Sequence, residues 1–212
     1  MDAKTVAAWL EQDPRRVRPA GYNSIYPLNV ELIIKKTKCL LPRKVIQNKK
    51  VLDLGAGIPY FELWCNQNNA HYTGVEIQRE TAKKAMQLIN ERNTFFHDSI
   101  ENFINTCDFD NYDVIVLSST LHLVKDYVRC LEKILSSKKT IIIEESKKNL
   151  SGASLSVRRE VNQYTDDPMQ SVKVQKWHAT EEFLHYYFNG AGYDVDMQAY
   201  KVACKILPDW FG

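Results

Sequence analysis

The residues best suited to chemistry lie in a short glycine loop, Asp53-Leu54-Gly55-Ala56-Gly57, which begins in an apolar run. Gly55 and Gly57 allow a tight turn and a close approach of the backbone to a ligand. The loop differs from the pyrophosphate-binding pattern G-x-G-x-x-G, because Tyr60 stands where the third glycine would be, and no Gly-Lys-Ser/Thr of a P-loop follows it. The sequence therefore predicts a ligand site that is not built for a pyrophosphate.

Two acids end the next two apolar segments. Glu76 closes the segment that follows the glycine loop, and Asp98 closes the one after it. A carboxylate at the tip of the second strand of an open parallel sheet can accept hydrogen bonds from both ribose hydroxyls, and it repels a 2′-phosphate. Asp98 can accept a hydrogen bond from an exocyclic adenine amine. The pattern favours an adenosine-type ligand, although each acid would also suit a solvated loop.

The elements that must position these acids follow from an alternation of short apolar runs with helical periods, which is typical of a parallel sheet covered by helices. Amphipathic helices are predicted around residues 82–89, 127–135 and 183–191, the last with Thr180 as its N-cap. Strands are predicted over residues 50–56, 71–77, 94–99, 112–119 and 139–146, and a closing hairpin over 193–198 and 201–207. We therefore expect an α/β fold with helices on both faces of the sheet.

Two segments depart from this pattern. Residues 1–45 contain two predicted helices, 5–12 and 29–41, and are expected to form an N-terminal helical cap on the substrate side. Residues 46–212 are expected to form the core domain. Within it, the polar insertion at about 147–178 predicts no clean strand and at most one short helix around residues 154–164. A long insertion without a packing role is usually functional.

Composition excludes several classes of protein. The chain has 212 residues, of which 44% are hydrophobic and 25% charged, so it can bury a sizeable core. The uncharged stretch 114–124 is about half as long as a membrane span, and the start lacks the pattern of a signal peptide. The five cysteines are scattered, with no spacing typical of a metal site, and are interpreted as reduced thiols. We expect a cytoplasmic protein that is not embedded in a membrane.

The net charge is only +2, but it is unevenly distributed. Residues 1–50 hold 11 Lys and Arg against 4 Asp and Glu. Such a basic segment can attract an anionic substrate or a nucleic acid. It is also explained by lysines on the polar side of the helix predicted over residues 29–41, so nucleic acid is not favoured as the partner.

The motifs V-L-D53-L-G55-A-G57, Y-T-G-V-E76-I, F-H-D98-S and Y-D-V-I-V-L-S-S resemble those of the class I S-adenosylmethionine-dependent methyltransferases. The likeness covers roughly residues 45–207. It implies a three-layer α/β sandwich with a Rossmann-like, seven-stranded, mostly parallel sheet and one antiparallel strand near the C-terminus. It also implies S-adenosylmethionine as the cofactor and S-adenosylhomocysteine as the product.

The resemblance assigns a cofactor-binding role to each motif residue. The glycine loop would line the methionine and sulfonium side, the acid after the second strand would hold the ribose, and the third and fourth strand ends would flank the adenine and the methyl donor. The implied cofactor-binding residues are Asp53, Gly55, Ala56, Gly57, Glu76, Ile77, Asp98, Ser99 and Ser118. One departure is Pro59, where the family usually has a third glycine.

The acceptor side offers one candidate catalytic residue. His122 lies three residues beyond Ser119, in the segment that borders the acceptor in this family, and would act as a general base if the acceptor must lose a proton. Its alternative role is packing between two leucines. The candidate substrate-binding residues are Tyr22, Tyr26, Ser119, Arg158 and Trp177.

We expect a methyltransferase that acts on a small molecule, because the chain shows no appended recognition domain. One alternative is an RNA or protein methyltransferase, which the basic first 50 residues would suit. Another is a non-catalytic module that binds S-adenosylmethionine or S-adenosylhomocysteine, which Pro59 and the lack of a certain base would suit. The sequence leaves open the acceptor, the atom methylated and the oligomeric state.

Overall fold

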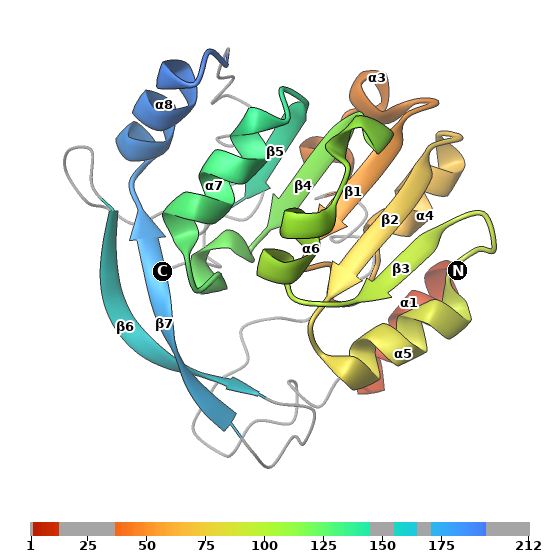
Figure 1. Ribbon diagram of the computed structural model, residues 1–212. Helices are drawn as coiled ribbons and strands as arrows, with labels where there is room; N and C mark the ends of the chain where they lie inside the picture. The colour runs from red at the N-terminus through yellow and green to blue at the C-terminus, as the bar shows by residue number, and fades with distance from the viewer. Residues whose placement is uncertain (1, 13–36, 145–154, 165–170, 194–212) are drawn as a thin grey trace.

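A five-stranded parallel sheet forms the centre of the protein (Figure 1). The computed structural model describes residues 2–12, 37–144, 155–164 and 171–193. The strand order is β3-β2-β1-β4-β5, so the order reverses between β1 and β4. The strands are β1 (Lys50–Leu54), β2 (His71–Glu76), β3 (Thr94–His97), β4 (Val114–Ser118) and β5 (Thr140–Glu144).

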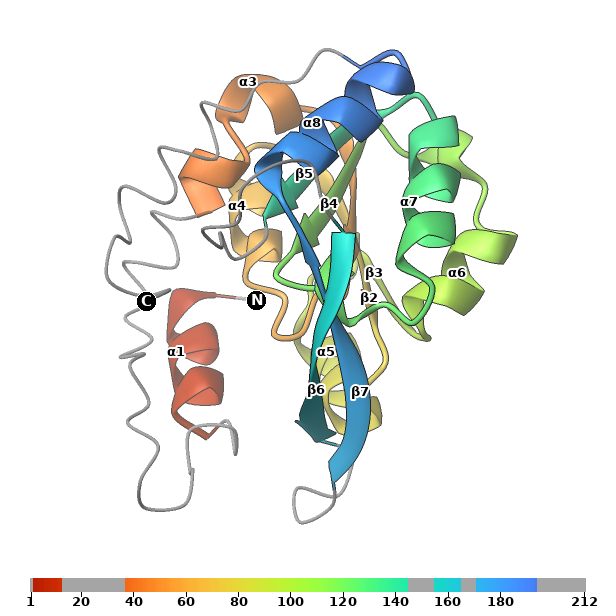
Figure 2. The same ribbon diagram turned by 90° about the vertical axis from the view of Figure 1, so that its left-hand side faces the viewer.

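Helices cover both faces of this sheet (Figure 2). Neighbouring residues of one strand point to opposite faces, so that Val51 packs in one apolar cluster and Leu52 in the other. The first cluster takes side chains from α1 (Ala3–Gln12), α3 (Arg43–Ile46), α4 (Phe61–Gln67) and α5 (Arg79–Leu88). The second takes them from α6 (Ile100–Thr106), α7 (Tyr127–Ser136) and α8 (Glu181–Gly190). Two short 3-10 helices, η2 (Phe109–Asn111) and η3 (Leu121–Leu123), flank β4.

Side-chain caps fix where the helices on the second face begin. The Ser99 hydroxyl accepts a hydrogen bond from the Asn102 amide at 3.1 Å, at the start of α6. Thr180 caps α8 in the same way through the Phe183 amide at 3.1 Å, as the sequence predicted. Such caps stabilise a helix by satisfying amides that have no partner within it. Gly192 follows α8 with a φ of +82°, a conformation that favours glycine.

The predicted strands between residues 50 and 146, and the helices around 5–12, 82–89, 127–135 and 183–191, are confirmed. The described part of the larger sheet has five strands, all parallel. The two further strands of the expected seven-stranded sheet, including the antiparallel one, lie almost entirely outside the described residues. Of the helix predicted over residues 29–41, only 37–41 are described, and of these 37–40 are helical.

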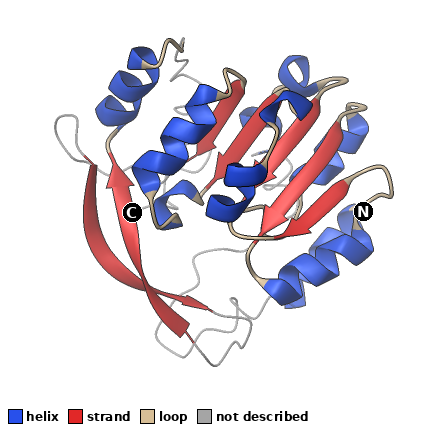
Figure 3. Ribbon diagram, in the orientation of Figure 1, coloured by secondary structure: helices blue, strands red, loops and turns tan. Residues whose placement is uncertain are grey.

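The prediction for the insertion at 147–178 was wrong. Its described residues form two long antiparallel strands, β6 (Leu155–Tyr164) and β7 (Ser171–Ala179), instead of a short helix (Figure 3). We call this pair the β6–β7 ribbon. Backbone hydrogen bonds join the strands of such a ribbon, so it does not need the continuous apolar run by which buried strands were recognised.

The N-terminal helix packs on the core. Trp9 of α1 is buried within the first apolar cluster, and the Lys84 ammonium of α5 lies 4.9 Å from the centre of its ring. In the described part of the chain no helix is long and apolar enough to cross a membrane.

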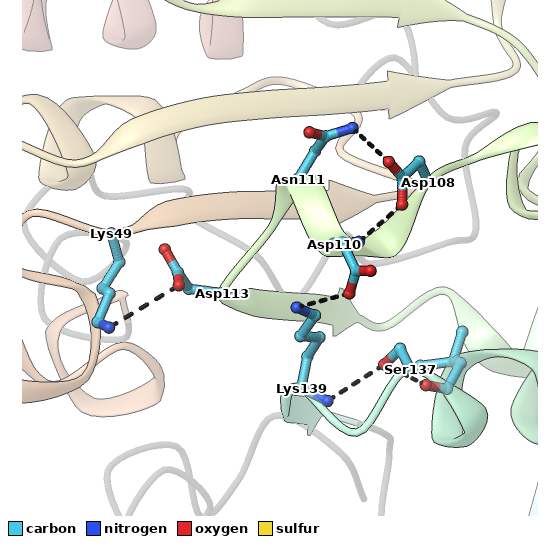
Figure 4. Close-up of polar contacts among 8 residues, drawn as sticks. Lys49, Asp108, Asp110, Asn111, Asp113, Ser137 and Lys139 are labelled. Carbon is cyan, nitrogen blue, oxygen red and sulfur yellow. Dashed lines mark hydrogen bonds and ion pairs between the residues drawn. The ribbon is translucent and has the colours of Figure 1, made fainter.

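Ion pairs connect segments at the amino ends of the strands, opposite the edge where ligands bind in this fold class (Figure 4). Lys49 lies 3.8 Å from the Asp113 carboxylate, between the segments that precede β1 and β4. Lys139 lies 3.3 Å from Asp110, between the segment before β5 and η2. Both pairs involve exposed carboxylates, so they contribute little to stability.

A glycine in the middle of β2 makes room for two aromatic side chains. A Cβ atom at Gly74 would lie 2.4 Å from a ring carbon of Phe95 and 2.9 Å from the Tyr72 hydroxyl oxygen. Both distances are too short for non-bonded atoms, so the close packing of Tyr72 and Phe95 requires glycine at this position.

We predict that Gly74→Ala destabilises the fold by about 1–3 kcal/mol, because the added methyl group overpacks a buried site. Urea unfolding monitored by tryptophan fluorescence measures this loss. Gly190→Ala is the matched control, since a Cβ atom there meets no described residue within 4 Å. Equal stability of Gly74→Ala and the wild type would contradict the packing role of Gly74.

Candidate functional site

The candidate residues gather at the carboxyl ends of the strands. Asp53 is in β1, Glu76 ends β2, and Ser118 ends β4. In an open parallel sheet, ligands bind outside this edge, at the point where the strand order reverses. Here that point lies between β1 and β4, whose pairing aligns Asp53 with Val116.

The two glycines of the loop after β1 have different surroundings. Gly55 has a φ of +75°, and a Cβ atom there would lie 2.1 Å from Thr120 Cγ2. Gly57 has a φ of +53°, and a Cβ atom there would meet no atom of the described residues within 4 Å. The Gly55 and Ala56 amides both donate to the Val75 carbonyl at 2.9 Å, which holds the loop against β2. Gly55 therefore serves packing, whereas Gly57 faces open space that a ligand can enter.

Glu76 joins the glycine loop to the end of β2. Its Oε2 accepts a hydrogen bond from the Gly57 amide at 2.9 Å, and its Oε1 accepts one from the Gln78 amide at 2.7 Å. Only 8% of the residue is exposed. Charged acceptors form stronger hydrogen bonds than neutral ones, so this carboxylate fixes the loop beside the open space at Gly57.

Asp53 lies beneath the loop and is only 2% exposed. The Tyr72 hydroxyl donates to Asp53 Oδ2 at 2.8 Å. Burial raises the pKa of Asp53 to about 7, and the negative charge of Glu76 adds to the rise, while the hydrogen bond from Tyr72 opposes it. Burial also raises the pKa of Tyr72 well above its ordinary value, so its hydroxyl stays neutral.

The ends of β2 and β3 present the residues expected at an adenine. Ile77 is 53% exposed directly after Glu76. The Asp98 amide donates to the Glu76 carbonyl at 3.1 Å, and Asp98 Oδ1 accepts from the Ser99 amide at 2.8 Å. Ser99 caps α6, which is a structural role for its hydroxyl.

The ends of β4 and β5 bring together residues on the other side of the reversal point. The Ser118 hydroxyl donates to the Glu144 carboxylate, which is buried. The Ser119 amide donates to the Glu144 carbonyl at 2.7 Å, and Ser119 has a φ of +54°. His122 follows within η3 and is half-buried. Sequence reasoning missed Glu144, although an acid that ends an apolar strand is the same signal that identified Glu76.

The remaining acceptor-side candidates are placed only in part. Arg158 lies in β6, where the register shifts between Val157 and Arg159, and Trp177 lies in β7 opposite Val157. Strand β7 contacts η3, so the ribbon borders the segment that carries His122. Tyr22 and Tyr26 lie outside the described residues.

An open groove of about 1030 Å³ lies elsewhere, between α7 and α8. Its lining includes Glu132, Leu135, Lys138, Tyr186 and Ala191. It contains none of the residues at the strand ends, so we assign it no part in the site.

A family model described as a methyltransferase domain matches residues 26–198. The chain belongs to this family of methyltransferase domains. A search of curated protein sequences finds no match.

Solved structures of methyltransferases share the fold. An S-adenosylmethionine-dependent methyltransferase from Mesorhizobium loti has a TM-score of 0.57 at 13% identity, covering 83% of this chain and 92% of its own. A putative one from Listeria monocytogenes has a TM-score of 0.55 at 16% identity, covering 79% and 86%. The 1,6-didemethyltoxoflavin-N1-methyltransferase of Burkholderia thailandensis has a TM-score of 0.52 at 15% identity, covering 92% and 82%.

The family match confirms that the chain is a methyltransferase domain, and the solved structures show that it has the fold of S-adenosylmethionine-dependent methyltransferases. At these identities the solved structures show the fold of this methyltransferase domain. The roles of individual residues therefore stay predictions.

We predict that Asp53→Asn changes how stability depends on pH. The folded-state pKa of about 7 lies above the ordinary value of 3.8, so the folded chain binds this proton more tightly than the unfolded chain. The stability contributed by this proton is complete below about pH 4 and is lost as the pH rises through about 7. Between these limits the wild type should lose about 4 kcal/mol relative to Asp53→Asn.

Urea unfolding at a series of pH values measures the difference between the two proteins. Asp110→Asn is the matched control, since the Asp110 side chain is 91% exposed. Parallel stability profiles for wild type and Asp53→Asn would contradict the perturbed ionisation of Asp53.

Proposed function

We propose that this methyltransferase domain binds S-adenosylmethionine outside the carboxyl ends of β1, β2 and β3 and transfers its methyl group to a small molecule. The observation that carries the proposal is the open space at Gly57 beside the buried carboxylate of Glu76. Because no described residue fills the space beside its Cα, Gly57 lets a ligand approach the backbone, and the adjacent carboxylate can accept hydrogen bonds from ribose hydroxyls.

The chain's own residues suit each part of the cofactor. Glu76 would hold the ribose, exposed Ile77 would pack against the adenine, and Asp98 would accept from its amine. The backbone of Gly55, Ala56 and Gly57, with Asp53 below it and Ser118 beyond it, would line the methionine side. When bound, the cofactor supplies an electrophilic methyl group on a sulfonium.

The acceptor would then lie on the β4–β5 side of the reversal point. Ser118, Ser119 and Glu144 provide polar groups there, and His122 in η3 is our candidate for the base that removes a proton from the acceptor. Alignment of the acceptor and exclusion of water are the main contributions that the chain must make. Arg158 and Trp177 of the ribbon remain proposed substrate contacts.

The small-molecule acceptor is supported by one of the similar structures, in which the Burkholderia thailandensis enzyme holds 1,6-didemethyltoxoflavin. The basic first 50 residues favour an RNA or protein acceptor as the second candidate. We also keep as proposals the division into a cap, residues 1–45, and a core domain, residues 46–212, and a cytoplasmic location.

We predict that Glu76→Gln weakens the binding of S-adenosylhomocysteine by about 10- to 100-fold, because the variant loses charge-assisted hydrogen bonds worth about 1.5–3 kcal/mol. Titration calorimetry measures the affinity, and a thermal melt checks that the variant is folded. Glu80→Gln is the matched control, since Glu80 is an exposed acid in the first turn of α5. Unchanged affinity of folded Glu76→Gln would refute the ribose assignment.

A transfer assay tests the acceptor class. The wild type is incubated with methyl-labelled donor and either a panel of small metabolites or total RNA and protein. We expect label in a small-molecule product and none in macromolecules. Label only in RNA or protein would overturn the small-molecule proposal.

His122→Ala should lower kcat for the small-molecule acceptor while leaving donor affinity unchanged. An unaltered kcat at every pH would remove His122 as the base.

A further inference from the structure

Tyr72, Gly74 and Asp53 form one buried unit beneath the glycine loop. Tyr72 and Gly74 lie two residues apart on the same face of β2, and Gly74 is aligned with Asp53 across the β1–β2 pair. Because Gly74 has no side chain, the Tyr72 hydroxyl can pass beside it and reach Asp53 Oδ2 at 2.8 Å. The sequence Tyr-x-Gly thus places a neutral donor on a carboxyl that is almost completely buried.

The surroundings of this carboxyl contain acids and a neutral thiol. Glu76 of β2 and Cys65 of α4 interact with Asp53, and Glu62 of α4 interacts with Cys65 and Tyr72. The aligned residue of β4 is Val116. Among the described residues, no Lys, Arg or His forms an ion pair with Asp53; Arg92 interacts instead with Cys65. Ionised Asp53 therefore lacks a balancing cation within this part of the chain.

A buried carboxyl without a cation holds its proton more tightly, because burial penalises the charged form. The pKa of Asp53 is accordingly raised to about 7. A cation that binds at the glycine loop would lower the pKa of Asp53 again, because it would stabilise the carboxylate. The methionine end of the proposed cofactor carries such a cation, an ammonium group, in both the donor and the product.

We propose that Tyr72 is a positioning residue that holds Asp53 toward the ammonium group at the methionine end of the cofactor, so that cofactor binding releases the proton of Asp53 to solvent. The inference rests on the proposed function. The step makes and breaks no bond other than the O–H bond of the Asp53 carboxyl, and the carboxylate left behind pairs with the ligand cation. The Tyr72 hydroxyl assists because it donates to the charged form of Asp53.

Calorimetry on the wild-type protein tests the proton release directly. S-adenosylhomocysteine is titrated at pH 6, 7 and 8 in buffers of different ionisation enthalpy, and the dependence of the heat on the buffer gives the number of protons released. We expect close to one proton per ligand at pH 6 and close to none at pH 8, where Asp53 is already ionised. The probe 5′-methylthioadenosine, which lacks the charged methionine end, should release none.

Three variants test whether the proton release depends on Tyr72 and Asp53. Tyr72→Phe removes the donor, so the fall in proton release should move to higher pH by about one unit, and affinity for S-adenosylhomocysteine at pH 7 should drop by about tenfold. Asp53→Asn should abolish the release. Tyr187→Phe is the matched control, because the wild-type Tyr187 hydroxyl also donates to a carboxylate, that of Glu132, at 3.0 Å, between α8 and α7. In this variant the proton release and the affinity for S-adenosylhomocysteine should stay at wild-type values.

The outcomes separate this inference from the proposed function. Binding of S-adenosylhomocysteine without proton release by the wild type would overturn the inference alone, as would a wild-type release profile in Tyr72→Phe or equal release with 5′-methylthioadenosine. Failure of the folded wild type to bind S-adenosylhomocysteine would overturn the proposed function, and this inference with it.

Discussion

The site depends on the carboxylate of Glu76, which accepts hydrogen bonds from the amides of Gly57 and Gln78. These amides belong to the segments that leave β1 and β2, so a single buried side chain fixes the relative position of two strand ends. Parallel strands bring their carboxyl ends to one edge, but they do not fix the loops that follow. Glu76 supplies that constraint and places a charged acceptor next to the open space at Gly57.

Glu76 and Asp53 are buried close together, and burial next to a like charge disfavours an ionised carboxyl. The two residues differ in the groups that donate hydrogen bonds to them. Glu76 accepts hydrogen bonds from two backbone amides, which carry partial positive charge. Within the described residues, Asp53 receives only the neutral hydroxyl of Tyr72, and burial raises its pKa to about 7. Two acids on neighbouring strands thereby acquire different chemistry: Glu76 is suited to hydroxyl groups, whereas Asp53 is suited to a cation.

The core of the fold could be predicted from sequence because buried parallel strands read as short apolar runs, and Glu76 and Asp98 could be located because they end such runs. The ribbon was missed because backbone pairing holds it together, so its strands need no such run. The Tyr72–Asp53 contact could not be predicted either, since it depends on strand register and on the space left by Gly74. The register between strands that are far apart in the sequence leaves no pattern in the residues of either strand.

Different constraints therefore act on the two halves of the sheet edge formed by the carboxyl ends of the strands. On the β1–β2 half, backbone amides and the Tyr72 hydroxyl hold the two acids in place. On the β4–β5 half, Ser118 and Glu144 form a polar pair, and β7 of the ribbon contacts η3, which follows β4. A ribbon joined through its backbone can change its side chains without unfolding the sheet. Under the proposed function, acceptor specificity can thus vary on the β4–β5 half while the residues proposed to bind the cofactor stay fixed.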